Sequence, residues 1–193
     1  MCNCILIMLN GFYKGVIMLA DNLTVTIDHV SNMIDKGYAF RAFVEFTIPA
    51  KSGGVDGEYS FSVKTGEQVA VLYNRIIDTD QPNIRYEVRT GAVTTNLREQ
   101  VEVRPQNPKN VRPVDVDFYR CDYTDAGELS DLDPLPGQAG SGSNASGDIY
   151  TASEPKPIPE NTESLIVFKN PNNVECKALL YYKWYHIGAN AWD

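Results

Sequence analysis

Residues 173–188 constrain the fold of this chain more than any other stretch, because they alternate strictly between two kinds of position. One set of alternate positions is apolar throughout: Val174, Cys176, Ala178, Leu180, Tyr182 and Trp184. The other set mixes charged residues with leucine and tyrosine. Successive side chains of a strand point to opposite faces, so this period of two predicts a strand with one buried face. At about 3.3 Å per residue, such a strand crosses a whole sandwich and supplies one side of its core.

Several other segments alternate in the same way, with turn residues between them. We predict strands over 22–28, 39–49, 58–64, 68–77, 84–89, 114–123 and 164–169, and a short edge strand over 100–104. Turn signals that recur at intervals of about eight to twelve residues are typical of an all-β sandwich or barrel. We therefore expect an all-β fold: an antiparallel, jelly-roll-like β-sandwich of about seven to nine strands.

Two local patterns add detail to this architecture. Residues 28–36 place Val30, Met33 and Ile34 at helical spacing, which indicates a single helical turn that Asp28 caps and Gly37 ends. Residues 170–173 read Asn-Pro-Asn-Asn, which is typical of a tight turn. We expect this turn to join residues 164–169 and the last strand as a hairpin.

Residues 124–161 differ in composition from the rest of the chain. Gly, Ser, Asp and Pro dominate there, and residues 138–147 read QAGSGSNASG, a tract typical of flexible chain. We expect the whole segment to be one long Gly/Ser/Pro-rich loop that leaves a single sandwich domain over residues 18–193. Loops of this length are usually functional or disordered.

Residues 1–17 form a leader that the sandwich does not need. Its apolar run, residues 4–9, is too short to span a membrane, and a signal peptide would need a basic start. Met18 is an alternative translation start, and a loosely packed N-terminal arm is another interpretation. Both predict that residues 1–17 add little to the core.

The composition argues against several classes of function. The formal net charge is −8 and no basic stripe occurs, so we expect neither a nucleic-acid partner nor a membrane partner. Eleven tyrosines against two histidines suit a sheet or a binding surface better than general acid–base catalysis. Glu45 and Glu87 suggest paired carboxylates on one sheet face, but Arg41, Arg85 and Arg89 would share that face. Cross-strand charge pairing is therefore the interpretation we favour, and we expect no enzyme.

The sequence predicts no cofactor and no metal site. Acidic residues crowd residues 115–133, namely Asp115, Asp117, Asp122, Asp125, Asp131 and Asp133, but they lack the glycine and glutamate positions of an EF-hand loop. A solvated acidic loop is the interpretation we favour, and a weak calcium site is the alternative. Cys121 and Cys176 are isolated in sequence, and Cys176 lies on the apolar face of the last strand, where we expect it to pack as a small hydrophobe. A bridge between them remains an alternative.

Exposed aromatic residues are the candidate binding site. Tyr181 and Tyr185 share the otherwise polar face of the last strand with Leu179, and Trp192 follows close behind. An aromatic row of this kind binds another protein chain or a sugar when it is exposed. It is core when another segment, such as residues 124–161, covers it. These three interpretations are open at this point.

A succession of short motifs resembles a class of small virion proteins of tailed bacteriophages. The motifs are VEFTIPA, YSFSVKTG, VAVLYNRII, IRYEVRTGA and a final YYKWYHIG, and they are distributed over residues 20–190. The resemblance implies a head decoration (cement) or head-fibre-like protein, or else a tail structural component, made in the bacterial cytoplasm and located in the virion. It implies that the partners are the major capsid protein and neighbouring copies of the chain itself, as a homo-oligomer on the virion. The alternative function is a carbohydrate-binding sandwich, associated with adhesion or the tail, that uses Tyr181, Tyr185 or Trp192.

Overall fold

The computed structural model describes residues 14–18, 24–134, 150–152 and 155–187 of the chain, and almost every element in them is a strand. In chain order the elements are β1 (Lys14–Met18), β2 (Thr24–Asp28), α1 (His29–Asp35), β3 (Ala39–Ile48), β4 (Gly57–Thr65), β5 (Val69–Thr79), β6 (Arg85–Thr90), β7 (Val93–Thr95), β8 (Val103–Pro105), β9 (Val116–Arg120), β10 (Asp122–Asp125), β11 (Glu128–Pro134), β12 (Tyr150–Ala152), β13 (Lys156–Ile158), β14 (Glu163–Asn170) and β15 (Cys176–Ile187).

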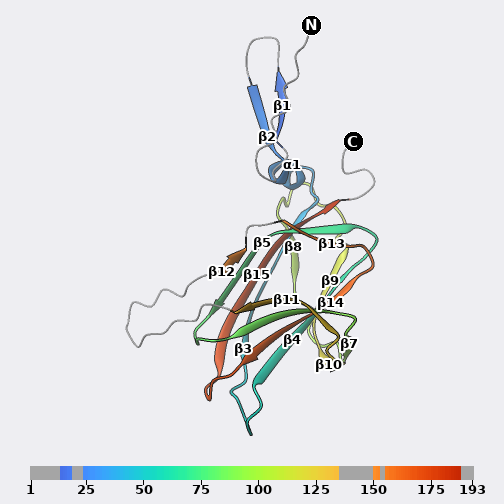
Figure 1. The fold of residues 1–193 in the computed structure, drawn as a ribbon. Helices are drawn as coiled ribbons and strands as arrows, with labels where there is room; N and C mark the ends of the chain where they lie inside the picture. The colour runs from blue at the N-terminus through green and yellow to red at the C-terminus, as the bar shows by residue number, and fades with distance from the viewer. Residues whose placement is uncertain (1–13, 19–23, 135–149, 153–154, 188–193) are drawn as a thin grey trace.

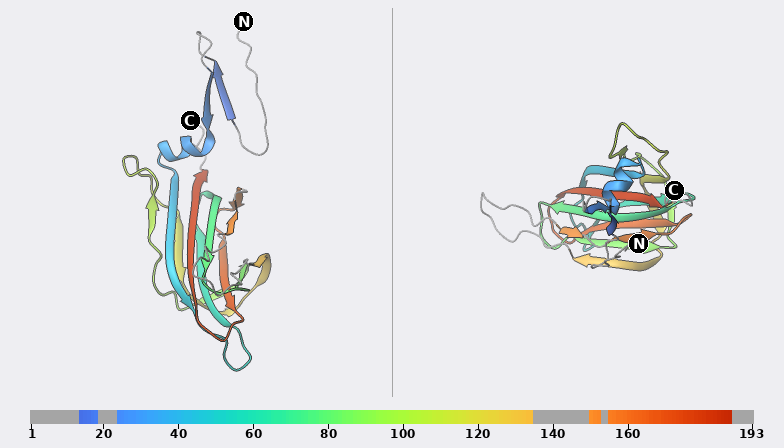
Figure 2. Two further views of the ribbon diagram at one scale, coloured as in Figure 1. Left: turned by 90° about the vertical axis from the view of Figure 1, so that its left-hand side faces the viewer. Right: turned by 90° about the horizontal axis from the view of Figure 1, so that it is seen from above.

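Two antiparallel sheets pack face to face (Figures 1 and 2). One, which we call the β15 sheet, has the order β12-β5-β15-β3-β8, and β13 also pairs with β5. The other, the β14 sheet, has the order β11-β6-β14-β4-β9. β15 and β14 are therefore the central strands of their sheets. This arrangement confirms the all-β sandwich that the alternating pattern predicts.

The path of the chain through these sheets is that of a jelly roll. β3, β4, β5 and β6 alternate between the two sheets, and β11 then lies beside β6. β12 and β13 together, β14 and β15 alternate between the sheets again. A jelly roll has eight strand positions, and these elements fill them with β12 and β13 sharing one. The total number of strands exceeds the expected seven to nine because short strands are added around this frame.

The added strands come mainly from an insertion between β6 and β11. This insertion extends both sheets on the same side, since β8 pairs with β3 and β9 pairs with β4. It also contributes β7 and β10, which pair with each other. The prediction over 114–123 is therefore two strands, β9 and β10, which separate at Cys121. β1 and β2 form a further two-stranded sheet of their own.

The inner faces of the two sheets enclose a core rich in aromatic rings. The apolar face predicted for the last strand is buried from Cys176 onward, with Cys176, Ala178, Leu180, Tyr182 and Trp184 each no more than 5% exposed, whereas Val174 precedes the strand and is 53% exposed. Phe46 of β3 contacts the rings of Tyr59, Phe61 and Phe168 at centroid distances of 4.7 to 5.1 Å. Edge-to-face contacts of this kind add to the free energy gained by burial.

The hairpin predicted between residues 164–169 and the last strand is wrong. β14 pairs with β4 and β6, whereas β15 pairs with β3 and β5, so residues 171–175 carry the chain from one sheet to the other. Asn170 holds this corner, because its side-chain amide donates to the backbone oxygens of Pro49 and Val174 at 2.9 and 2.8 Å. Two strands that each have two neighbours in their own sheet have no edge left for one another.

The prediction of a single long loop over 124–161 is also wrong, because both ends of this segment form strands. β11 pairs with β6 over six residue pairs, and β12 and β13 both pair with β5. These strands complete the jelly roll on the side opposite the insertion. Residues 135–149, which include most of the Gly/Ser tract, lie outside the described residues. So do residues 1–13 of the predicted leader, while Lys14–Met18 forms β1.

The helical turn predicted near residue 30 is confirmed as α1. Gly37 ends it with a φ of +84°, and its amide donates to the Ile34 oxygen at 3.0 Å. A β-carbon at Gly37 would lie 2.2 Å from the backbone oxygen of Asn110, so this position needs glycine for two reasons. α1 covers one end of the outer face of the β15 sheet, as the left panel of Figure 2 shows.

Candidate functional site

The predicted aromatic row of Tyr181, Tyr185 and Trp192 is divided in the structure. Tyr185 is only 7% exposed, because Met33 of α1 packs over it, and it also contacts the rings of His29 and Tyr73. Burial raises the pKa of its hydroxyl. Tyr181 lies further along the strand, beyond the helix, and keeps part of its surface exposed. Trp192 lies outside the described residues.

Tyr181 is the centre of an apolar row that crosses three strands on the outer face of the β15 sheet. The pairing register places Phe43 of β3 on one side of Tyr181 and Ile76 of β5 on the other. Phe43 is 52% exposed, and its ring lies 6.3 Å from that of Tyr181 in an edge-to-face arrangement. Phe43 is an apolar residue on the polar face of its strand, and that was the sequence signal for this row.

A groove of about 520 Å³ runs along this apolar row. Its walls are Arg41, Phe43, Ile76, Glu102, Arg104, Leu179 and Tyr181. Glu102 and Arg104 form an exposed ion pair at 2.6 Å along one wall. An aromatic floor with planar charged side chains beside it suits contact with a protein surface or a sugar ring, and it holds no nucleophile–base pair.

Charged residues flank the apolar row on both sides, with opposite sign. On one side the register aligns Arg41 with Lys183, whose ammonium lies 5.1 Å from the Tyr181 ring centroid. On the other side it aligns Glu45 and Asp78 with Leu179. We call residues 41, 43, 45, 76, 78, 179, 181 and 183 the outer patch. It is the candidate functional site of the described residues.

Glu45 and Glu87 do not share a sheet face, so the expectation that they might is wrong. Glu45 lies on β3 in the β15 sheet, and Glu87 lies on β6 in the β14 sheet. Glu87 is 5% exposed and forms ion pairs with Arg89 at 2.8 Å and Lys169 at 3.2 Å. Burial acts to raise the pKa of Glu87, but its hydrogen bonds from Arg89 and Lys169 outweigh that effect and lower it.

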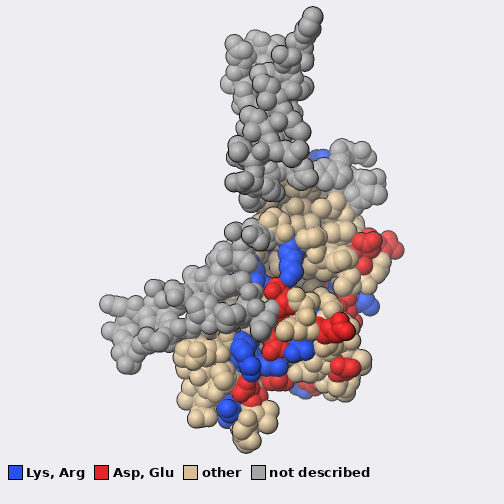
Figure 3. Space-filling view, viewed as in Figure 1, with Lys and Arg blue, Asp and Glu red and all other residues tan. Residues whose placement is uncertain are grey.

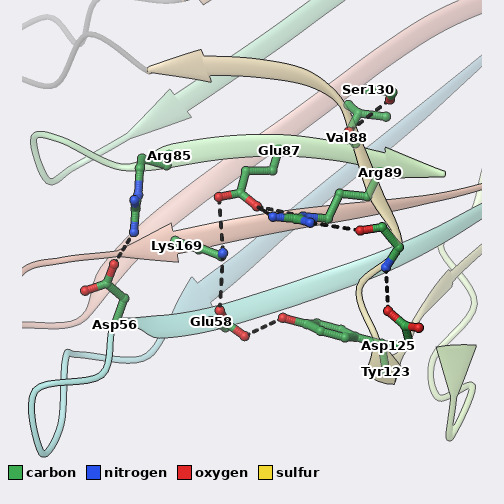
Figure 4. Close-up of polar contacts among 11 residues, drawn as sticks. Asp56, Glu58, Arg85, Glu87, Val88, Arg89, Tyr123, Asp125, Ser130 and Lys169 are labelled. Atoms are coloured by element: carbon green, nitrogen blue, oxygen red, sulfur yellow. Dashed lines mark hydrogen bonds and ion pairs between the residues drawn. The ribbon is translucent and has the colours of Figure 1, made fainter. Parts of the chain in front are cut away.

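Glu87 belongs to a charged network on the outer face of the β14 sheet (Figure 4). Lys169 also approaches Glu58 at 3.8 Å, and Glu58 accepts a hydrogen bond from the Tyr123 hydroxyl at 2.6 Å. Figure 3 shows basic and acidic side chains next to each other on this side of the molecule. Glu87 pairs across strands with Lys169 and within its own strand with Arg89, whereas Arg41 and Glu45 form no ion pair among the described residues, so the predicted cross-strand pairing is confirmed only for Glu87.

The acidic segment 115–133 distributes its side chains among separate partners. Asp115 accepts from the backbone amide of Gln68 at 2.7 Å, Asp122 pairs with Arg98 at 2.6 Å, and Asp131 pairs with Lys156 at 2.5 Å. Among the residues that the structure describes, no group of three or more His, Cys, Asp or Glu side chains gathers as a metal ion would need. The segment is not the solvated loop that we predicted, because β9, β10 and most of β11 lie within it.

Both described cysteines are free and buried, in different parts of the core. Cys176 packs in the core between the sheets, as predicted, and Cys121 packs with Leu165 and Val167 under the β7–β10 pair. Burial raises the pKa of Cys121 to about 11 and that of Cys176 to about 12. Their thiols stay protonated at neutral pH and are poor nucleophiles.

A second cavity, of about 220 Å³, lies between the sheets beside β13. The Tyr86 and Tyr182 hydroxyls meet at its inner wall at 2.5 Å, and the Arg75 guanidinium lies 4.7 Å from the Tyr86 ring centroid. Burial raises the pKa of both tyrosines. The two protonated hydroxyls form a hydrogen bond with each other, so this pair has a structural role in the core. The alternation in the sequence did not predict the pair.

No helix in the described part of the chain is long and apolar enough to cross a membrane. Comparison with known protein families, with curated proteins and with solved structures found no match.

Proposed function

We propose that this chain is a structural protein of a tailed-bacteriophage virion, made in the bacterial cytoplasm, and that it decorates the head by binding the lattice of the major capsid protein. The observation that carries the proposal is where the five motifs of the resemblance fall. They lie on or across β3, β4, β5, β6 and β15, which are jelly-roll strands. Jelly rolls occur in viral capsid proteins, lectins and cupins, so the fold is compatible with the role without selecting it.

We assign the capsid contact to the end of the sandwich where residues 49–56, 80–84 and 171–175 meet, at the bottom of Figure 1. Asn172 joins these loops, because its amide donates to the Pro82 oxygen at 2.7 Å and its backbone oxygen accepts from Lys51 at 2.7 Å. Val55 and Val174 are 69% and 53% exposed there. Braced loops with exposed apolar side chains bind with little ordering entropy, which supports this assignment.

In this role the protein stabilises the head by adding interface area between capsid subunits. A decoration protein repeats at equivalent lattice sites, so each small contact is multiplied by symmetry. The net charge of −8 helps to keep the chain soluble before it reaches the lattice.

The test is co-sedimentation of the purified chain with expanded capsids of the phage that encodes it, together with mass spectrometry of its virions. We expect saturable binding at a fixed ratio to the major capsid protein. Val55→Asp combined with Val174→Asp should abolish binding, while Val93→Asp, at a residue that is also 53% exposed, should not. A few copies per virion without binding to bare capsids would move the protein to the tail, and absence from virions would refute the proposal.

The second candidate function is carbohydrate binding, and the groove beside Tyr181 and Phe43 is the observation that favours it. The buried Tyr185 contributes no stacking surface, so the platform would be Phe43 and Tyr181, with Arg41 and Arg104 as hydrogen-bond donors. Retention on a glycan array that Phe43→Ala removes would support this function. Unchanged retention in that variant, or no retention of the wild-type chain, would exclude it.

A further inference from the structure

The outer patch carries opposite charges at two positions of one strand, with an exposed aromatic residue between them. Along β3, Arg41, Phe43 and Glu45 share the outer face, and all three side chains are exposed. Arg41 and Glu45 are four residues apart, which is about 13 Å along a strand. Within the described residues neither of them forms an ion pair. Because the strand holds these two opposite charges too far apart to pair with each other, both are available to pair with charges of a second molecule.

The same order of charge continues across the patch. Lys183 lies on the Arg41 side of the apolar row and Asp78 lies on the Glu45 side. The patch is therefore a basic row, an apolar row and an acidic row in succession. A patch with this order matches an identical patch that is turned through 180°, because the basic row of each then faces the acidic row of the other.

We infer that the outer patch binds the outer patch of a second copy of the chain, about a two-fold axis that runs along the row of Phe43, Tyr181 and Ile76. Such a rotation reverses the strand direction and lays the basic row of each copy on the acidic row of the other. Arg41 of one copy then faces Glu45 of the second, and this contact occurs twice. Sheets that pack face to face lie about 10 Å apart, which leaves room for the Phe43 and Tyr181 rings between them.

Charge favours a second copy over another kind of occupant. A capsid protein or a glycan would need its own matching succession of charge, whereas this chain supplies it by symmetry. The matched rows of opposite charge supply this attraction locally, although the net charge of −8 on each copy acts against association. The inference does not rest on the proposed capsid role, because it concerns the purified chain alone.

The experiment is a charge reversal measured by sedimentation velocity from micromolar to millimolar concentration. Arg41→Glu and Glu45→Arg each place two like-charge contacts in the dimer, so each should raise the dissociation constant about tenfold or more. The double variant, with both reversals, restores opposite charges at both contacts and should return the constant to near the wild-type value. Lys64→Glu, an exposed charge reversal in the β14 sheet, is the control and should leave it unchanged.

A cross-linking experiment tests the position of the axis. The axis passes beside residue 43, so a short bifunctional thiol cross-linker should join Phe43→Cys into a covalent dimer, in a background that carries Cys2→Ser and Cys4→Ser. Val93→Cys, on the β7–β10 pair, should stay monomeric under the same conditions. Circular dichroism of each variant shows whether it is folded.

Three results would overturn the inference. One is a wild-type chain that stays monomeric up to millimolar concentration. Another is a double reversal that associates no better than the single reversals, which would show that residues 41 and 45 do not face each other. The third is a monomer whose Phe43→Glu variant loses binding to capsids or to a glycan, which would assign the patch to that partner instead.

Discussion

His186 couples the packing of the core to pH. Its side chain is fully buried at the end of β15, next to the Phe40 ring, and its Nε2 accepts a hydrogen bond from the backbone amide of Asp115 at 3.3 Å. Burial lowers the pKa of the imidazole from 6.5 to about 4, although the Asp115 charge acts in the other direction. The folded chain therefore holds His186 neutral at a pH where the unfolded chain protonates it.

We expect the free energy of unfolding to fall as the pH decreases from 6.5 to about 4, with His186 contributing about 3 kcal/mol of the loss. The unfolded state binds the extra proton in this range, so the stabilisation is complete above pH 6.5. Urea titrations at several pH values would measure it. His186→Gln should flatten the fall relative to the wild type. Parallel curves for wild type and His186→Gln would contradict this account.

Asn170 is a residue whose importance follows from its position at the corner between the sheets. It is fully buried, its amide donates to two backbone oxygens, and its side-chain oxygen accepts from the amide of Asn172 at 3.0 Å. We expect Asn170→Ala to lower the free energy of unfolding by about 2–4 kcal/mol, because it leaves buried carbonyls without donors. Asn173→Ala, at an exposed position of the same corner, is the matched control for chemical denaturation. Equal losses in both variants would show that Asn170 has no special role.

At the element scale, the alternating pattern predicts strands and their buried faces well but says nothing about partners. β3, β4, β5, β6, β14 and β15 all lie where the period of two places them. The pairing of β14 and β15 could not be read in this way, since a hairpin and a crossover between sheets need the same alternation and the same turn residues. β11, β12 and β13 were missed because they are short or rich in polar residues, and their neighbours supply the stability that their own sequence lacks.

The candidate site was predictable only in part, because alternation gives the faces of a strand but not the segments that pack beside it. Alternation places Tyr181 and Tyr185 on one face of the last strand. It does not tell which of the two α1 covers, because that depends on how the residues before β3 pack against the sheet. Phe43 was visible in the sequence as an apolar residue on a polar face. Its neighbour Ile76 became part of the row only through the register between β5 and β15.

Gly37 lies between α1 and β3, and a substitution there tests how tightly this junction is packed. We expect Gly37→Ala to destabilise the chain by more than about 1 kcal/mol, because alanine is strained at a φ of +84° and its β-carbon would meet the Asn110 oxygen. Gly53→Ala is the control, since Gly53 has a φ of +60° but open space around it. The difference between the two thermal midpoints measures the steric part. If both variants lose the same amount, the close approach of residue 110 is irrelevant to stability.

At the scale of the whole molecule, the insertion between β6 and β11 is part of the folded core rather than an appended loop. Phe118 of β9 is 1% exposed and lies between two core rings, 5.3 Å from Phe61 and 6.0 Å from Tyr182 in centroid distance. Val101 and Val116, also from the insertion, are buried in the same cluster. The insertion and the jelly-roll frame therefore have one core in common.

We expect Phe118→Ala to lower the free energy of unfolding by about 3–5 kcal/mol and to leave a single cooperative transition. Far-ultraviolet circular dichroism and tryptophan fluorescence should then report the same urea midpoint. Tyr119→Ala, on the opposite face of β9, should cost much less. Two separate transitions in the variant would show instead that the insertion unfolds as an independent unit.

The outermost strands of both sheets have a consequence for fibre formation. β8, β12 and β13 are three residues long, and β8, β11 and β13 each contain a proline. β9, at the other margin of the β14 sheet, has neither property, but residues 98–101 form hydrogen bonds with it. A proline lacks the amide that a neighbouring chain would need, and a strand this short offers few free hydrogen-bonding groups. Copies held close together, as on a shared surface, therefore have little tendency to join these described margins side by side into an amyloid-like ribbon. Among the described residues, the margins of the two main sheets are therefore poor templates for strand addition, while their outer faces and loop ends offer surface for specific contact.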